Sequence, residues 1–241
     1  MGLVRRKSVA ATPDAASGTS RKRAMQQLLS TQHAERLKRT LIGHALVLGT
    51  FIGIMWIVEI IDLAIFSGGL DGLGIQPRTM VGLRNIAFSP FLHVGPGHLL
   101  ANTLPFIVLG WLVMVRRATD FAVVAATAAV VSGVGVWLLG ATGTIHVGMS
   151  GVIFGFLGYL LARGYFERSI PSIVLAVMAV VLYGGMIFGI LPLQRDISWL
   201  GLLFGLFGGM AAAYALADRT NQGLRLNLEG LRGTDFPRRH E

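Results

Sequence analysis

The 241-residue sequence contains no cysteine, so it forms neither disulfide bonds nor thiolate metal sites. Charged residues are scarce, at 14% of the chain, whereas 53% of the residues are hydrophobic. This composition is too apolar for an average soluble domain and indicates a membrane protein. No lysine follows Lys38, so none is expected inside the apolar part of the chain. We predict no cofactor, metal or nucleotide site.

Charged residues avoid several runs of about 20 residues, the length that a helix needs to cross roughly 30 Å of hydrocarbon. We therefore predict an all-α, polytopic membrane protein with a bundle of six transmembrane helices. The helices are expected near residues 41–67, 97–115, 121–140, 150–162, 171–191 and 198–217. The fourth range is short for a crossing. A long polar leader precedes the first apolar run, so no cleavable signal is expected.

Three regions follow from this pattern. Residues 1–40 form a basic N-terminal tail, residues 41–217 form the membrane domain, and residues 218–241 form a polar C-terminal tail. Residues 1–24 have the composition of a disordered tail, so no fold is expected there. Residues 25–39 fit two alternatives, a helix lying on the inner leaflet or a solvated leader.

The net charge of +9 is distributed as a membrane topology would require. In a six-span arrangement, 18 of the 21 lysines and arginines lie on one side, leaving Arg78, Arg84 and Arg195 on the other. The positive-inside rule then places both termini in the cytoplasm of a bacterial-type cell. Basic tails beside a membrane are expected to meet anionic lipids, and nucleic acid is not an expected partner.

Polar residues occur near the predicted outer ends of the second, fourth and sixth helices. In the second, His98 and Asn102 are four residues apart and share one helix face. Polar side chains in a bundle usually face its interior, where a hydrogen bond between helices is the plainer alternative to a site. His93 belongs to the preceding loop, where it is either solvated or braces the loop.

Ser150 begins the fourth helix, between Gly148 and Gly151. An ordinary N-cap is the plain explanation for a serine at this place. Glycine also permits close backbone approach, which a nucleophile beside an oxyanion pocket needs. The fourth and sixth helices carry glycines four residues apart, which favours close packing of these two helices. These glycines are residues 151 and 155, and residues 201, 205 and 209.

Over residues 41–217 the sequence resembles the rhomboid family of intramembrane serine peptidases. "HVGPGHLLANT" is similar to the family's His-x-x-x-Asn element, and "GMSGVIFG" to its Gly-x-Ser-Gly nucleophile motif. The resemblance implies that Ser150 is the catalytic nucleophile. It also implies that His98, Asn102 and the backbone N–H of Ser150 bind the oxyanion. Phe154 would flank the general base.

The family's third element is a sixth-helix histidine, followed three residues later by glycine. Here "ISWLGLLFG" has Leu202 three residues before Gly205. Leucine accepts no proton, so a Ser–His dyad does not form. His146 in the outer loop is a weak alternative base, and Glu59 and Asp62 are expected to brace the loop.

The sequence leaves two functions open. The first is a serine endopeptidase scaffold that acts on transmembrane helices near the outer face, with weak or absent activity. The second is a catalytically inactive relative that binds client transmembrane helices, a pseudoprotease. A channel or transporter is disfavoured, because the spans lack paired charges and broken repeated halves.

Overall fold

The computed structural model describes residues 13–185, 188 and 198–233, and these residues are almost entirely helical. Their contacts divide the chain into two units, residues 1–46 and 47–241. The first unit consists of the beginning of α1 (Pro13–Ile61). The second unit contains the rest of α1 and the helices α2 to α7. Within the described ranges there is no β-strand, and one isolated antiparallel bridge joins Ile75 to His146.

The N-terminal region is helical from Pro13 onward. The expectation of no fold over residues 1–24 is therefore wrong for residues 13–24, while residues 1–12 lie outside the described part. Alanine, glutamine, leucine, lysine and arginine are frequent after Pro13, and all of them favour helix. The predicted helix over residues 25–39 is present as part of α1, and its place on a membrane surface stays a prediction.

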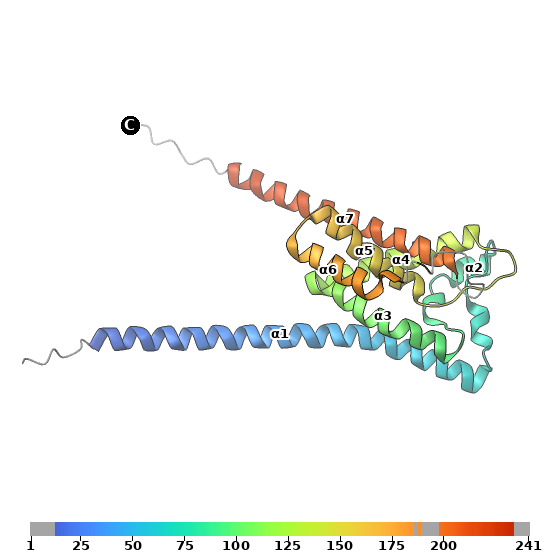
Figure 1. The fold of residues 1–241 in the computed structure, drawn as a ribbon, viewed down its shortest axis with the longest axis horizontal. Coiled ribbons are helices and arrows are strands. Elements are labelled where there is room, and N and C mark those ends of the chain that lie inside the picture. Colours follow the sequence, from blue (N-terminus) through green and yellow to red (C-terminus); the bar gives the residue numbers. More distant parts are fainter. Residues whose placement is uncertain (1–12, 186–187, 189–197, 234–241) are drawn as a thin grey trace, which may run out of the picture. The chain divides into compact units, whose positions relative to one another are not determined.

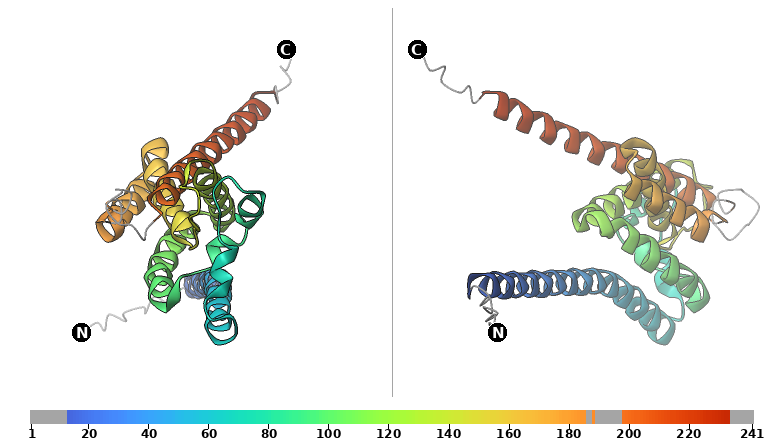
Figure 2. Two further views of the ribbon diagram at one scale, coloured as in Figure 1. Left: turned by 90° about the vertical axis from the view of Figure 1, so that its right-hand side faces the viewer. Right: turned by 60° about the vertical axis from the view of Figure 1, so that its left-hand side comes forward.

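In the described part of the second unit six further α-helices follow, and Figures 1 and 2 show α7 continuing well beyond the end of its neighbours. They are α2 (Met80–Asn85), α3 (Gly95–Arg116), α4 (Ala118–Leu139), α5 (Ser150–Glu167), α6 (Ile170–Tyr183) and α7 (Trp199–Gly233). A π-helical turn at Asp62–Phe66 ends α1, and 3₁₀ turns occur at Gly69–Leu73 and Ser89–Phe91. The described part of each predicted span is mainly helical, and the fourth extends five residues past its expected end.

Among the described residues, four helical segments are long and apolar enough to cross a membrane. They are Leu29–Phe66, Gly95–Val115, Ala118–Leu139 and Trp199–Ala217. α6 is apolar but shorter, and residues 186, 187 and 189–191 of the predicted fifth span lie outside the described part. The molecule is thus an all-helical bundle with four clear membrane spans, and the full count of six stays a prediction.

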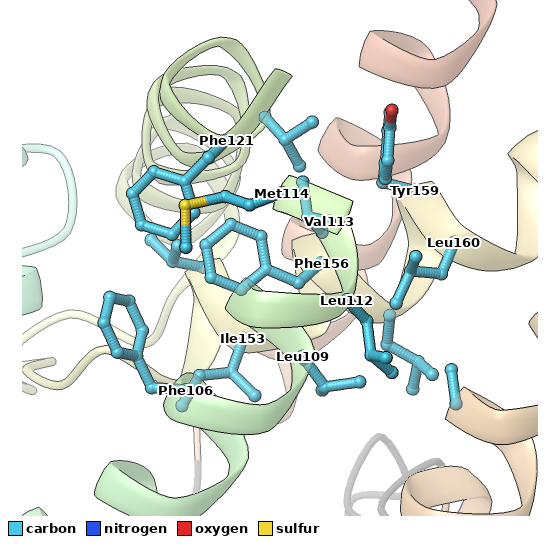
Figure 3. Packing of buried hydrophobic residues seen from close by; sticks show 14 of the residues in the cluster. Phe106, Leu109, Leu112, Val113, Met114, Phe121, Ile153, Phe156, Tyr159 and Leu160 are labelled. Atoms are coloured by element: carbon cyan, nitrogen blue, oxygen red, sulfur yellow. The ribbon is translucent and has the colours of Figure 1, made fainter. Parts of the chain in front are cut away.

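The helix α5 is the centre of the second unit. Every residue from Gly151 to Gly164 except Leu161 is buried, because α3, α4, α6 and α7 all pack around it. Figure 3 shows Ile153, Phe156 and Leu160 of α5 interleaved with side chains of α3 and with Phe121 of α4. A helix that is apolar on all sides requires such a surrounded position.

The chain between α1 and α3 is held firmly on α4. Trp137 of α4 donates its indole N–H to the carbonyl oxygen of Thr79 at 2.7 Å, and the N–H of Arg78 donates to the carbonyl of Trp137 at 2.9 Å. Gly133 lets Ile86 approach so closely that a Cβ atom there would overlap with it. The short helix α2 therefore forms a fixed wall beside α4.

Candidate functional site

The chain turns into α5 through Gly148, whose φ of +115° suits glycine alone. The N–H of Gly148 donates to the carbonyl of Ser89 at 2.8 Å, which fixes the loop. A Cβ atom on Gly148 would lie 2.9 Å from Cε1 and 3.1 Å from Nε2 of His98, and 3.6 Å from Nδ2 of Asn102. Glycine is thus required at position 148 for two reasons, the positive φ and the close approach of the His98 ring. Ser150 follows two residues later as the first residue of α5.

The two polar side chains predicted on one face of a helix do lie together, in the first two turns of α3. His98 is half-buried and Asn102 is buried. Within the described chain, Nδ2 of Asn102 is buried without a hydrogen-bond partner. An unpaired buried donor is costly in a stable protein, and here it lies next to the backbone that leads into Ser150. The helix-to-helix hydrogen bond considered for Asn102 is not formed by this atom.

His93 braces the loop that leads into Ser150. Its side chain is only 1% exposed, and its Nε2 accepts the backbone N–H of Met149 at 3.4 Å. Its ring meets the ring of His98 edge to face, with centroids 5.2 Å apart. Burial, together with the neighbouring His98, lowers the pKa of His93 to about 4, so the ring is neutral at pH 7 and can accept this bond. Of the two alternatives for His93, the structure supports loop bracing.

Ser150 lines a small cavity of about 30 Å³ at the beginning of α5. Polar side chains from four separate segments line the same space, namely Ser89, Ser132, His146 and Ser198. Such a volume accommodates about two water molecules. Sequence reasoning missed Ser89 and Ser132, because a lone serine in an apolar run carries no distinguishing pattern.

His146, the weak alternative base, lies on this cavity together with Ser150. Its Nε2 is 2.8 Å from Oγ1 of Thr144, so that nitrogen is already engaged. Burial lowers the pKa of His146, which keeps its ring neutral at pH 7. Glu59 and Asp62 line neither this cavity nor the Gly148 contact. Asp62 instead accepts the N–H of Leu70 at 2.8 Å, which agrees with the expected bracing of the loop.

The sequence predicted that its fourth and sixth helices approach each other closely. The structure confirms this, since α5 packs directly on α7. A Cβ atom on Gly205 would overlap with the carbonyl oxygen of Gly151, and one on Gly209 with that of Gly155. Ser132 of α4 adds a hydrogen bond of 2.8 Å to the carbonyl of Gly201. The backbones of α5 and α7 are therefore in direct contact beside Ser150.

Leu202 lies in the first turn of α7 and is 3% exposed. Its N–H donates to the carbonyl of Ser198 at 3.2 Å, so the turn is regular at this position. Phe154, one turn after Ser150, is 2% exposed. Residues 171–217 contain no histidine at all. In the part of the chain that the structure covers, no three His, Cys, Asp or Glu side chains are grouped as metal ligands.

Comparison with known proteins identifies the family to which this chain is similar. The model of the family described as Rhomboid domain matches residues 82–219. "Uncharacterized protein Rv1337" of Mycobacterium tuberculosis (strain ATCC 25618 / H37Rv) is 36% identical over 211 residues, which cover 84% of this chain and 87% of that relative. "Uncharacterized protein ML1171" of Mycobacterium leprae (strain TN) is 36% identical over 213 residues, which cover 84% of this chain and 82% of that relative.

Proposed function

Because this chain belongs to the rhomboid family, we propose that it is an intramembrane serine-protease scaffold whose nucleophile position is Ser150 and whose hydrolytic activity is weak or absent. The supporting observation is one contact. The side chains of His98 and Asn102 lie within 3.6 Å of where a Cβ atom on Gly148 would stand, and the buried Leu202 occupies the first turn of α7. These positions support a serine-protease site that lacks its proton acceptor.

In this proposal, Ser150 attacks the carbonyl carbon of a peptide bond in a transmembrane substrate. His98, Asn102 and the N–H of Ser150 donate to the oxyanion that forms, in a place where backbone N–H groups at a helix start have no partner. The unpaired Nδ2 of Asn102 supports this role, since it is a donor held ready without a ligand. The hydroxyl proton must leave as the new C–O bond forms, and Leu202 has no atom to accept it.

The loss of the base has a predictable size. Removing the histidine of a soluble serine protease lowers turnover by about 10⁶, or about 8 kcal/mol of barrier. Intact oxyanion donors retain about 10³ to 10⁴ over the reaction in water. Residual hydrolysis is therefore expected near the limit of detection, with His146 as the alternative acceptor.

A fluorophosphonate probe tests whether Ser150 is a nucleophile at all. Detergent-solubilised wild-type protein is expected to react slowly, and the label is expected on Ser150. The reaction should vanish in Ser150→Ala, while Ser198→Ala, which removes another serine of the same cavity, should retain it. Identical labelling and identical cleavage of a transmembrane substrate by wild type and Ser150→Ala would end the peptidase proposal.

A second function is supported by the way Leu202 is accommodated. It is buried in a regular turn, and the glycine contacts of α5 with α7 are intact, so the scaffold persists without the base. Such a scaffold would bind client transmembrane helices without cutting them. A fluorescent transmembrane peptide in proteoliposomes should then bind wild type and Ser150→Ala with equal affinity and remain whole. Cleavage by wild type, or no preference over a scrambled peptide, would contradict this function.

The chain is an integral, multi-pass membrane protein, as the family and the four apolar segments require. The finer topology belongs to the proposal: both termini in the cytoplasm, the Ser150 cavity toward the outside, and the basic tails on anionic lipid. Reaction of single cysteines with an impermeant reagent in whole cells tests it. Thr142→Cys near the cavity should react, and Thr31→Cys should react only after lysis.

A further inference from the structure

An apolar groove of about 560 Å³ runs along α4 in the second unit. Its walls come from α1 beyond residue 46, from α2 and the turn after it, and from α3 and the start of α5. Every residue that lines it is apolar except Arg84. The groove is separate from the Ser150 cavity, although Pro90, Ala129 and Val152 line both.

The groove exists because α4 presents small side chains on one face. Ala122, Ala125, Ala126 and Ala129 follow the spacing of one helix face and leave room that larger residues would fill. Aromatic rings flank this floor. Phe51 stacks on Phe91 with centroids 5.9 Å apart, and it meets Phe121 edge to face at 5.7 Å.

The opposite wall is rigid, because α2 is tied to α4. The bond from Trp137 to Thr79 and the contact of Ile86 with Gly133 hold this wall in place. A groove between fixed walls is preformed, so a ligand need not spend free energy on opening it. A preformed apolar groove on a multi-pass membrane protein meets the acyl chains of the bilayer as its solvent.

Among the described residues that line this groove, Arg84 is the one that carries a charge. It lies in the last turn of α2 and is exposed. It forms no hydrogen bond or ion pair with any residue that the structure describes. A guanidinium group binds a phosphate well, often through two parallel hydrogen bonds. An unpaired arginine at the edge of an apolar groove therefore complements an amphipathic molecule with an anionic head.

The size of the groove selects its occupant. From Ala122 to Val134 the floor spans about 18 Å along the helix. A transmembrane helix with its side chains is about 10 Å across, and its backbone offers Arg84 no anionic group. A single extended hydrocarbon chain is narrow enough to enter.

We infer that this groove binds a membrane phospholipid, with one acyl chain lying along the alanine face of α4 and the phosphate on Arg84. The site is distinct from the peptide-cleaving site of the family, and it does not depend on the state of Leu202. Because Val152 and Pro90 separate the two spaces, the bound chain also forms part of the packing behind the Ser150 cavity.

Photolabelling of the full chain in nanodiscs tests this site. The probes are a phosphatidylglycerol with a diazirine near the end of one acyl chain, and a diacylglycerol with the same chain. Mass spectrometry is expected to find the phospholipid label concentrated within residues 122–134 of α4, and not on exposed residues of α6 such as Val177 and Val181. Labelling in proportion to exposure on both helices would overturn the inference.

Substitutions test the binding of the phosphate and of the acyl chain separately. Arg84→Gln should lower phospholipid labelling of α4 about fivefold and leave diacylglycerol labelling unchanged, as expected for one lost charge. Ala126→Trp and Val130→Trp should abolish labelling by both probes, because the indole fills the groove, while Ala211→Trp on exposed α7 should not. Thermal unfolding confirms that each variant is folded.

Two results would refute the inferred occupant. If Arg84→Gln lowers the labelling by both probes equally, or by neither, the phosphate is not bound at Arg84. If an excess of transmembrane peptide displaces the acyl-chain label, the groove belongs to a protein helix and not to a lipid. Neither result depends on hydrolysis, so failure here is distinguishable from failure of the proposed function.

Discussion

The two ends of α5 differ in how their polar groups are satisfied. At the Arg163 end, the guanidinium of Arg163 donates to Asp120 and, at 2.7 Å, to Glu167. Tyr159 donates to the same Asp120 at 2.6 Å, and Ser172 donates to Glu167. At the Ser150 end, Nδ2 of Asn102 and Oγ of Ser198 are buried without a partner among the described residues.

This difference distinguishes paired polar groups, which stabilise the fold, from unpaired polar groups, which are expected to bind a ligand. A buried charge must be paired, so the Asp120 cluster is a structural joint between α4, α5 and α6. An unpaired donor costs free energy unless a ligand or transition state uses it. Function is therefore expected at the Ser150 end, and stability at the Arg163 end.

The largest expected effect is a gain of activity. Leu202→His supplies a proton acceptor where the proposed site lacks one, so peptide hydrolysis should rise by up to about 10⁶-fold, or ~8 kcal/mol of barrier. Cleavage of a transmembrane substrate in proteoliposomes measures it. Leu203→His, on another face of α7, and the double variant Leu202→His/Ser150→Ala should both remain inactive. An inactive Leu202→His protein would mean that the pocket has changed beyond this one residue.

The next largest effect is expected from breaking the ion pair between Arg163 and Asp120. Arg163→Met takes the guanidinium away from the buried Asp120 and leaves the hydrogen bond from Tyr159, which should cost about 3–5 kcal/mol of stability. Thermal unfolding in detergent measures the lower midpoint. The double variant Asp120→Asn/Arg163→Met removes both charges and should regain part of the loss. An unchanged midpoint in the single variant would show that the pair is not structural.

In contrast to Arg163→Met, Asn102→Ala should lower activity and leave stability nearly unchanged. Its Nδ2 has no partner to lose, so the unfolding midpoint should change little. In the Leu202→His background it should lower turnover about 10²- to 10³-fold, or ~3–4 kcal/mol, as the loss of one oxyanion donor does. Thr103→Ala, at the next position of α3, is the contrasting control, because it loses the hydrogen bond from Trp56 and should lower stability while turnover stays the same. A large loss of stability with unchanged turnover would assign Asn102 to the fold.

The smallest effect is a pH dependence of stability. The pKa of His93 is about 4 in the folded protein and close to 6.5 when unfolded. Its contribution is therefore complete above pH 6.5 and is lost as the pH falls toward 4, by up to about 3 kcal/mol. Unfolding midpoints between pH 7 and 4 should fall less steeply in His93→Gln, whereas His33→Gln, at an exposed position, should follow wild type. Equal slopes would exclude His93 as the cause.

The sequence predicted the helices and the close packing beside Ser150 because the signals for these features are local. Apolar runs located the helices, a spacing of four placed His98 and Asn102 on one face, and glycine repeats predicted the contact of α5 with α7. The matching family model confirms the family that these motifs indicated. The Asp120–Arg163 pair went unpredicted, because 43 residues separate partners that only packing brings together. The helical start at Pro13 was missed because charge was weighed above helix propensity.

By itself, the sequence determined the helical class, the membrane environment and the absence of a base at residue 202, since composition, periodicity and residue identity are properties of the chain. Only the tertiary structure decided that His93 supports the backbone before Ser150, that four separate segments share one cavity, and that small alanines on α4 leave a groove. These features depend on which surfaces pack together, and that choice is made by contacts between residues far apart in the chain.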